Sequence, residues 1–244
     1  MRLTSDTNEA RRILLQNRRL DIGDSGGLVS DSAQNVFGRS MTLVEYVQRI
    51  IDDVRDGGDS AIQNLNEKID GYRQKSLVVS QEDIEAAYYR IDSSLREALE
   101  FSAQRIREFH ELCRIEDWND ESKGYGQRFI PVHSAASYVP GGTAKYPSTV
   151  LMTSIPARIA GVRQISITCP SAQGRNPPDS VLAAAYIAEV DCVYAIGGAQ
   201  SIAALAYGTE TVNAVDIICG PGNLFVTLAK KLVYGDVGID GLYG

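Results

Sequence analysis

Residues 192–208 read CVYAIGGAQSIAALAYG, and this stretch decides the fold. It opens with a short apolar run that includes Val193 and Ile196, which favours a buried strand. Two glycines follow, and after them comes a segment rich in alanine and leucine, which favours a helix. A strand, a glycine turn and a helix in this order form the repeating unit of an α/β protein.

The same unit recurs on both sides of this stretch. Apolar runs at 134–140, 164–170 and 214–221 are each followed by a helical segment, and a further run lies at 237–244. The runs are apolar on both faces and rich in valine and isoleucine, as parallel strands covered on both sides are. Residues 131–244 are therefore predicted to form a doubly wound, mostly parallel, Rossmann-like α/β sheet of about five strands.

Residues 1–130 are predicted to form a mainly helical N-terminal region with a connector. Thr42 and Glu45 have capping-box form at the start of one helix, and Gly57-Gly58 ends its apolar periodicity. A short helix is expected over 59–69, and another is expected to open at Ser80. The helical pattern ends at about residue 115.

Three more expectations concern this region. Residues 20–38 are polar and Gly-rich, so we expect a loop or an extended segment there. Residues 115–130, RIEDWNDESKGYGQRF, are expected to be a charged connector. Between them, a long helix is predicted to begin at Ser93 or Ser94. The residues that it is expected to turn inward are Leu95, Leu99, Ile106, Phe109 and Cys113.

Charge and cysteine content exclude several classes of protein. The net charge is −7, which suits a phosphate backbone poorly, so no nucleic-acid partner is expected. The N-terminus has no signal-peptide pattern and the sequence has no apolar stretch of about 18 residues, so no membrane association is expected. The four cysteines show no C-x-x-C spacing, which favours reduced thiols and a cytoplasmic location.

Glycines occupy three of the predicted strand-to-helix turns, namely Gly141-Gly142, Gly197-Gly198 and the GPGN of residues 220–223. In a parallel sheet these turns share the edge where helix N-termini converge and ligands bind. Three such turns with planar polar side chains beside them indicate a nucleotide or another phosphate-bearing ligand. The G-x-G-x-x-G fingerprint and the Walker A motif are absent, so a dinucleotide would be held in a different way.

Three side chains at these turns are candidate cofactor-binding residues. Tyr138 ends the first strand and could stack on a flat ring, or it could be a core aromatic residue. Gln200 lies in the first turn of a helix, where glutamine is not a usual cap, and its amide offers donors and an acceptor. Asn223 ends GPGN, where it could bind a ligand or cap the helix that follows.

No catalytic or metal-binding residue is predicted in this sequence. The only two histidines, His110 and His133, lie in different predicted elements, and no Ser, Cys or His arrangement forms a triad. A thiol mechanism of the aldehyde-dehydrogenase type needs an exposed, reactive cysteine. Most of the cysteines instead lie in apolar runs.

Two long segments that contain these turns resemble the histidinol dehydrogenase family closely. They are SYVPGGTAKYPSTVLMTSIPARIAGV (137–162) and YAIGGAQSIAALAYGTETVNAVDIICGPGNLFVTLAKKLVYGDVGID (194–240), with weaker similarity at DDVRDGGDSAI and RIREFHE. The resemblance implies oxidation of L-histidinol to L-histidine through an aldehyde, with two NAD reduced, by a homodimer whose zinc ion holds the substrate. It places the family's NAD-contacting tyrosine, glutamine and asparagine on Tyr138, Gln200 and Asn223.

The resemblance also implies where the remaining chemistry lies. The family's substrate-binding serine, its zinc ligands and its Glu-His catalytic pair all follow the position that matches Gly244. We therefore expect this chain to be inactive alone and to lack zinc ligands and catalytic residues of its own. Two alternatives remain open: a dehydrogenase of the same family that acts on another zinc-bound alcohol, and a non-catalytic nucleotide-binding fragment.

Overall fold

The computed structural model describes residues 6–16, 26–141, 144–171 and 175–242. The chain divides into two compact units, Met1–Tyr46 and Val47–Gly244. The first unit contains α1 (Thr7–Gln16), α2 (Gly26–Phe37) and the start of α3 (Leu43–Asp70). The second unit contains the sheet and the helices that cover it.

The prediction of a loop or extended segment over residues 20–38 is wrong from Gly26 onward, because α2 begins there. The earlier residues of that segment lie outside the described ranges up to residue 25. Ala33 and Val36 are buried at helical spacing, and the rings of Phe37 and Tyr46 meet edge to face with centroids 5.5 Å apart. Apolar contact along one face stabilises a helix here in spite of its polar composition.

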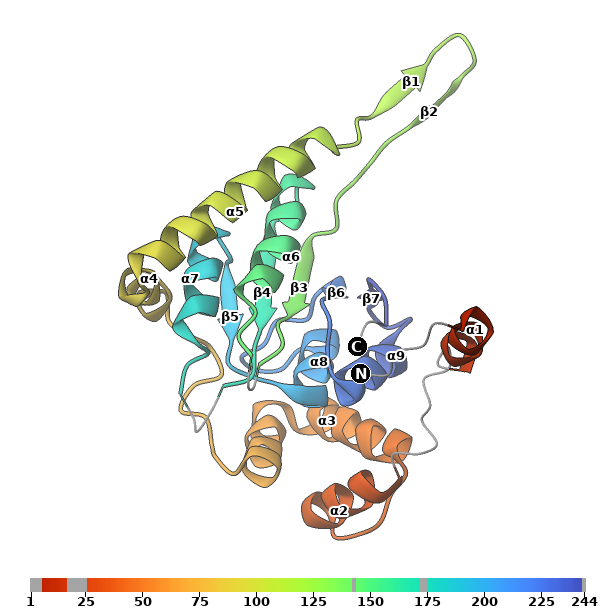
Figure 1. Cartoon of the computed structure of the whole chain (residues 1–244), viewed down its shortest axis with the longest axis vertical. Helices are drawn as coiled ribbons and strands as arrows, with labels where there is room; N and C mark the ends of the chain where they lie inside the picture. The colour runs from red at the N-terminus through yellow and green to blue at the C-terminus, as the bar shows by residue number, and fades with distance from the viewer. Residues whose placement is uncertain (1–5, 17–25, 142–143, 172–174, 243–244) are drawn as a thin grey trace. The chain divides into compact units, whose positions relative to one another are not determined.

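The second unit is built on a five-stranded parallel sheet with the strand order β5-β4-β3-β6-β7, which confirms the predicted fold class (Figure 1). The strands are β3 (Ser134–Tyr138), β4 (Gln164–Thr168), β5 (Cys192–Tyr194), β6 (Ile217–Cys219) and β7 (Gly238–Ile239). From β3 the chain adds two strands on one side and then returns to add two on the other. The sheet therefore has its topological switch point between β3 and β6, where open α/β sheets bind ligands.

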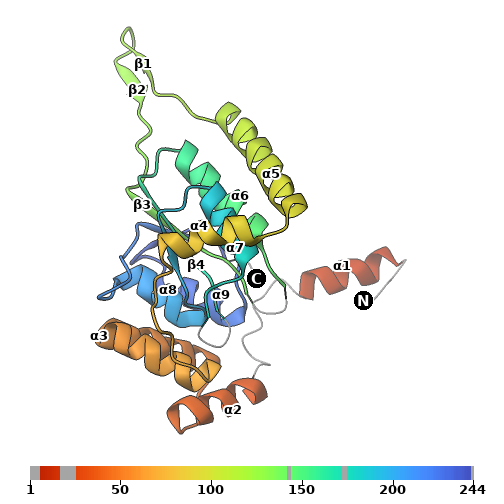
Figure 2. The ribbon, with the colours of Figure 1, turned by 90° about the vertical axis from the view of Figure 1, so that its left-hand side faces the viewer.

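Helices cover the sheet in two groups. In the first group, α6 (Pro147–Ile159) and α7 (Asp179–Ile187) pack on each other and on α5 (Ser93–Leu112), and α4 (Gln81–Arg90) packs on α7 (Figure 2). In the second group, α8 (Gly198–Tyr207) packs on α9 (Leu224–Val233). None of the described helices has both the length and the apolar character that a bilayer span requires.

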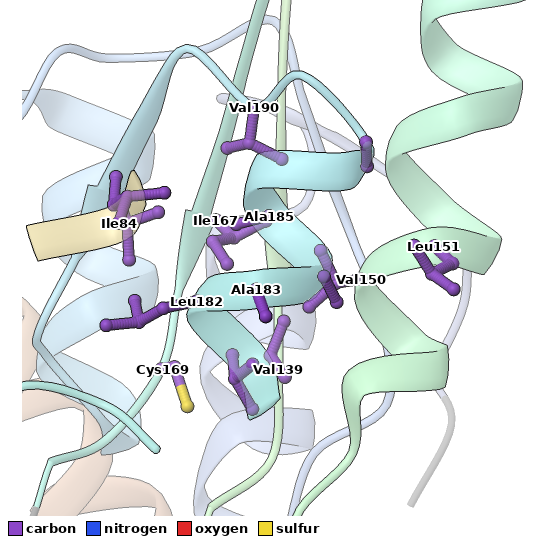
Figure 3. Packing of buried hydrophobic residues seen from close by; sticks show 14 of the residues in the cluster. Ile84, Val139, Val150, Leu151, Ile167, Cys169, Leu182, Ala183, Ala185 and Val190 are labelled. Carbon is purple, nitrogen blue, oxygen red and sulfur yellow. The ribbon is translucent and has the colours of Figure 1, made fainter. Parts of the chain in front are cut away.

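One hydrophobic cluster of the second unit lies between the sheet and the first group of helices. Figure 3 shows Leu182 and Ala183 of α7 beside Ile167 of β4, with Val150 of α6 next to them. All four side chains are fully buried. Because α7 carries a run of small and branched apolar residues, it packs closely against the sheet.

The helix α3 is kinked where the sequence predicts a break, at Gly58, whose backbone angles are φ 55° and ψ −139°. The carboxylate of Glu210 accepts a hydrogen bond from Asp59 N at 2.8 Å and so caps the second half of the helix. Asp59 in turn accepts from the hydroxyl of Thr209 at 2.6 Å and from that of Thr211. These bonds tie the second half of α3 to the loop that follows α8.

The orientation predicted for α5 is only partly right. Leu99 is buried and Ile106 is partly buried, as expected. Phe109 is 62% exposed, Leu95 is 37% exposed and Cys113 is exposed, so the inward orientation predicted for these three is wrong. The buried face of α5 rests on α6 and α7, and it ends before the last turn of the helix.

The charged connector over 115–130 contains secondary structure that its composition does not predict. β1 (Trp118–Asp120) pairs antiparallel with β2 (Tyr125–Gln127), and this hairpin extends away from the sheet in both views (Figures 1 and 2). The Trp118 and Tyr125 rings meet edge to face with centroids 5.9 Å apart. A cross-strand aromatic pair of this kind stabilises a hairpin whose other residues are polar.

The open edge of β5 is covered by the segment that precedes α4. Val78 forms an antiparallel bridge with Tyr194. Val79 N donates to the carbonyl of Val193 at 2.9 Å, and Ala195 N donates to the carbonyl of Leu77 at 2.8 Å. The segment 77–79 therefore satisfies backbone groups that β5 would otherwise present unpaired.

Candidate functional site

The candidate site lies at the carboxyl ends of the strands, where the turns after β3, β4, β5 and β6 converge. At the switch point, a side chain on Gly220 would overlap the carbonyl oxygen of Tyr138, so the turn after β6 lies directly against the end of β3. Gly220 also has a φ of 97°, which favours glycine. This close approach brings the GPGN turn to the residue that the sequence singles out on β3.

Pro170, in the turn after β4, explains why two of the other turn positions are glycines. An added Cβ on Gly141 would lie 2.5 Å from Pro170 Cγ, and one on Gly197 would lie 2.5 Å from Pro170 Cβ. Both glycines thus make room for a proline of the protein itself. Gly142, which the sequence also singles out, lies outside the described residues.

Tyr138 connects the end of β3 to the start of α8. Its side chain is 4% exposed, and its hydroxyl oxygen accepts a hydrogen bond from Gly198 N at 3.4 Å. Burial raises the pKa of Tyr138 to about 12, so the phenol is neutral at physiological pH. The hydroxyl retains its own proton as a donor at the N-terminus of α8.

Gln200 is buried rather than presented to solvent, with 2% of its surface exposed. Its Nε2 donates to Asn66 Oδ1 of α3 at 3.2 Å, and its Oε1 lies on the side of Gly198, where an added Cβ would approach it to 2.5 Å. Tyr138 and Gln200 therefore meet at one residue, Gly198. The structure brings these two predicted site residues together.

Asn223 lies in the turn between β6 and α9. It is exposed and is the N-cap of α9. Its side-chain oxygen accepts from Val226 N at 3.1 Å, which leaves the amide nitrogen as the group available to a ligand. Hydrogen bonds from Lys230 and to Asp240 also hold this turn in place at Gly220. Lys230 is fully buried and donates to the carbonyl of Gly220 at 2.9 Å and to Asp240 at 2.5 Å, while Asp240 accepts from Gly220 N at 2.9 Å.

Two of the thiols, Cys169 directly after β4 and Cys219 at the end of β6, give no support to a cysteine mechanism. Cys169 is fully buried, and burial raises the pKa of its thiol to about 12. Burial also raises the pKa of Cys219 to about 11. Neither group forms a thiolate near neutral pH. Within the described ranges, no group of three or more His, Cys, Asp and Glu side chains could hold a metal ion.

Asn66, Lys230 and Asp240 are polar residues near these turns that the sequence patterns do not single out. Asn66 shares a helix face with the buried residues Ile62 and Leu65, so a polar residue on an apolar stripe is the signal that could have found it. Lys230 is followed by a second lysine, Lys231, and a pair of lysines in the last turn of a helix usually faces solvent. The position of Lys230, four residues after Val226 and three before Val233, both fully buried, is the signal that it lies on the apolar face of α9.

The parallel sheet, its strand order and its switch point between β3 and β6 define a doubly wound, Rossmann-like α/β protein. The family model for histidinol dehydrogenase matches residues 37–244. The chain is 46% identical to the histidinol dehydrogenase of Methanothermobacter thermautotrophicus over 235 residues, which cover 94% of this chain and 51% of the relative. It is 48% identical to that of Prochlorococcus marinus strain MIT 9313 over 220 residues, covering 89% and 49%.

A solved structure agrees with the sequence comparisons. The crystal structure of histidinol dehydrogenase from Elizabethkingia anophelis superposes with a TM-score of 0.79 at 29% identity, covering 88% of this chain and 52% of that one. The chain belongs to the histidinol dehydrogenase family. It spans about half the length of the curated relatives that it matches.

Proposed function

We propose that the complete protein is an NAD-dependent oxidoreductase of histidine biosynthesis that converts L-histidinol to L-histidine in two successive oxidations. The observation that carries this proposal is the match of residues 37–244 to the histidinol dehydrogenase family. The switch-point geometry supports it, because the turns after β3, β5 and β6 lie together where such sheets bind nucleotides.

In this proposal Tyr138, Gln200 and Asn223 bind the dinucleotide. Each has a polar group at the carboxyl edge of the sheet: the Tyr138 hydroxyl, the Gln200 carboxamide and the Asn223 amide nitrogen. NAD supplies the acceptor for the hydride. The contribution of these residues is to hold and orient it, by hydrogen bonds to polar groups of the cofactor.

The described residues do not fit a zinc site, since they provide no group of three metal-binding side chains. We propose that the zinc ion and the base belong to the part of the family that this chain does not cover. The proposal also includes a homodimer and a cytoplasmic location. The cytoplasmic location is supported by the four free cysteines, because reduced thiols are usual in that compartment.

The test uses the complete protein, with NADH formation followed for L-histidinol and for other small alcohols. Two NADH per histidinol are expected. Gln200→Ala should weaken NAD binding by about 1–3 kcal/mol, because polar partners lose a hydrogen bond. Gln104→Ala, on the exposed face of α5, is the matched control and should leave binding unchanged. Faster turnover of another alcohol would favour a different substrate, and unaltered NAD affinity in Gln200→Ala would contradict the site.

A further inference from the structure

Asn66 is a buried amide with only one of its two polar groups satisfied. It is 1% exposed, and its Oδ1 accepts the hydrogen bond from Gln200 Nε2 at 3.2 Å. Its Nδ2 is also buried and has no hydrogen-bond partner among the residues that the structure describes. A buried donor without an acceptor is costly, so such groups are rare in native proteins unless a ligand or water completes them.

The surroundings hold this amide in place. Ile62 and Leu65 are buried on the same face of α3, and the helix half that carries all three residues is capped by Glu210. Gln200 is confined from the other side, since its Oε1 lies close to Gly198, whose φ is 65°. The two amides are therefore fixed relative to the turn that also receives the Tyr138 hydroxyl.

We propose that Asn66 is a part of the dinucleotide site: its Oδ1 orients the Gln200 carboxamide, and its Nδ2 donates to an oxygen of the bound dinucleotide. This inference rests on the proposed NAD-dependent function. It extends the site from the sheet to α3, so that the cofactor is recognised by a pair of amides, one from each side. A dinucleotide offers ribose, phosphate and carboxamide oxygens as acceptors for the unpartnered N–H.

Two substitutions separate the two roles of Asn66. Asn66→Leu has a similar volume and removes both the acceptor and the donor. Asn66→Asp keeps an acceptor toward Gln200 but replaces the donor with a second acceptor, which would face the oxygens of the ligand. Asn64, two positions away, is exposed on the same helix and accepts from Arg73, so Asn64→Leu and Asn64→Asp are matched controls.

The experiment measures the dissociation constant of NAD by calorimetry in the complete protein, together with KM for NAD and for L-histidinol. Asn66→Leu and Asn66→Asp should each raise the dissociation constant and the KM for NAD about tenfold, with KM for histidinol changed less than about twofold. The Asn64 variants should stay within about twofold of the original protein. Thermal unfolding without nucleotide reports whether each variant folds; if Asn66→Leu does not, Asn66→Asp and the smaller Asn66→Ser carry the test.

The outcomes are distinguishable from a failure of the proposed function. If the original protein binds no NAD, the proposed function fails. If it binds NAD and Gln200→Ala weakens binding while Asn66→Leu does not, the inference is overturned and the function stands. NAD affinity in Asn66→Asp equal to that of the original protein would also overturn it, since Nδ2 would then have no role toward the ligand.

Discussion

Asn223 can have two roles, as the N-cap of α9 and as a ligand-binding residue, and its two side-chain atoms separate them. Its side-chain oxygen caps α9, while its nitrogen is the group proposed to meet the cofactor. The sequence is compatible with both roles, because asparagine is favoured at an N-cap and its amide can also bind a ligand. The geometry shows the cap, and it leaves the ligand contact as a proposal.

Asn223→Ala should lower the free energy of unfolding by about 1 kcal/mol through loss of the cap, whereas Asn223→Asp should keep it, because the carboxylate also accepts from Val226 N. Both variants should weaken NAD binding, since neither provides the amide donor. Urea unfolding and calorimetric titration measure the two effects separately. If Asn223→Asp binds NAD as tightly as the original protein, Asn223 acts only as a capping residue.

At the scale of elements, apolar runs and glycine turns predict the strands and their order of appearance, because buried parallel strands need continuous apolar sequence. Short polar elements were missed for the complementary reason. The β1–β2 hairpin depends on a few contacts, such as the Trp118–Tyr125 ring pair, which leave no periodic pattern, and in α2 the apolar spacing of Ala33 and Val36 is short and lies among polar residues. The glycine turns after β3 and β5 favour a ligand when the sequence is considered alone, but in the structure Pro170 accounts for the missing side chains of Gly141 and Gly197.

Gly58, at the kink of α3, combines a left-handed backbone with a close neighbour. Its φ is 55°, and an added Cβ would overlap the Glu210 carboxylate that caps the second half of α3. Gly71, at the end of α3, has a φ of 76° and open space around it. Gly71→Ala should therefore cost about 1–2 kcal/mol from backbone strain alone.

Gly58→Ala should lower the free energy of unfolding by at least about 1 kcal/mol more than Gly71→Ala. The Gly58 variant has the same backbone strain and in addition loses the cap that Glu210 provides. Thermal unfolding of the two variants makes the comparison. Equal losses would mean that Glu210 moves aside freely and that its hydrogen bond to Asp59 contributes little.

The two faces of α5 should respond differently to truncation. Leu99 is 6% exposed, so Leu99→Ala should destabilise the protein by about 2–5 kcal/mol. Phe109 is 62% exposed, so Phe109→Ala should change stability by no more than about 0.5 kcal/mol. Chemical unfolding of both variants tests this; a large loss in Phe109→Ala would restore the inward orientation that the sequence pattern suggested.

For the molecule as a whole, three phenols with raised pKa values predict a limit to its stability in alkali. Burial is the largest cause that raises the pKa values of Tyr138, Tyr194 and Tyr207 to about 12 each. An unfolded chain ionises its tyrosines near pH 10. Because the folded-state pKa values are raised, their contribution to stability is fully present below about pH 10 and is lost as the pH rises toward about 12.

The free energy of unfolding should accordingly fall steadily above about pH 10. Urea unfolding across this range, with phenolate absorbance followed in the same samples, measures the decline. Tyr138→Phe should make it shallower, because one of the groups that ionise on unfolding is removed. A decline of equal slope in Tyr138→Phe would show that this phenol titrates normally in the folded protein.

The segment 77–79 has a consequence for how this sheet meets other chains. By pairing antiparallel with β5, it occupies an edge that could otherwise template strand addition by a neighbouring polypeptide. Intermolecular β-aggregation from that side first requires the segment to detach. The resistance of the sheet to fibril-like growth at β5 thus depends on three residues that belong to none of its five strands.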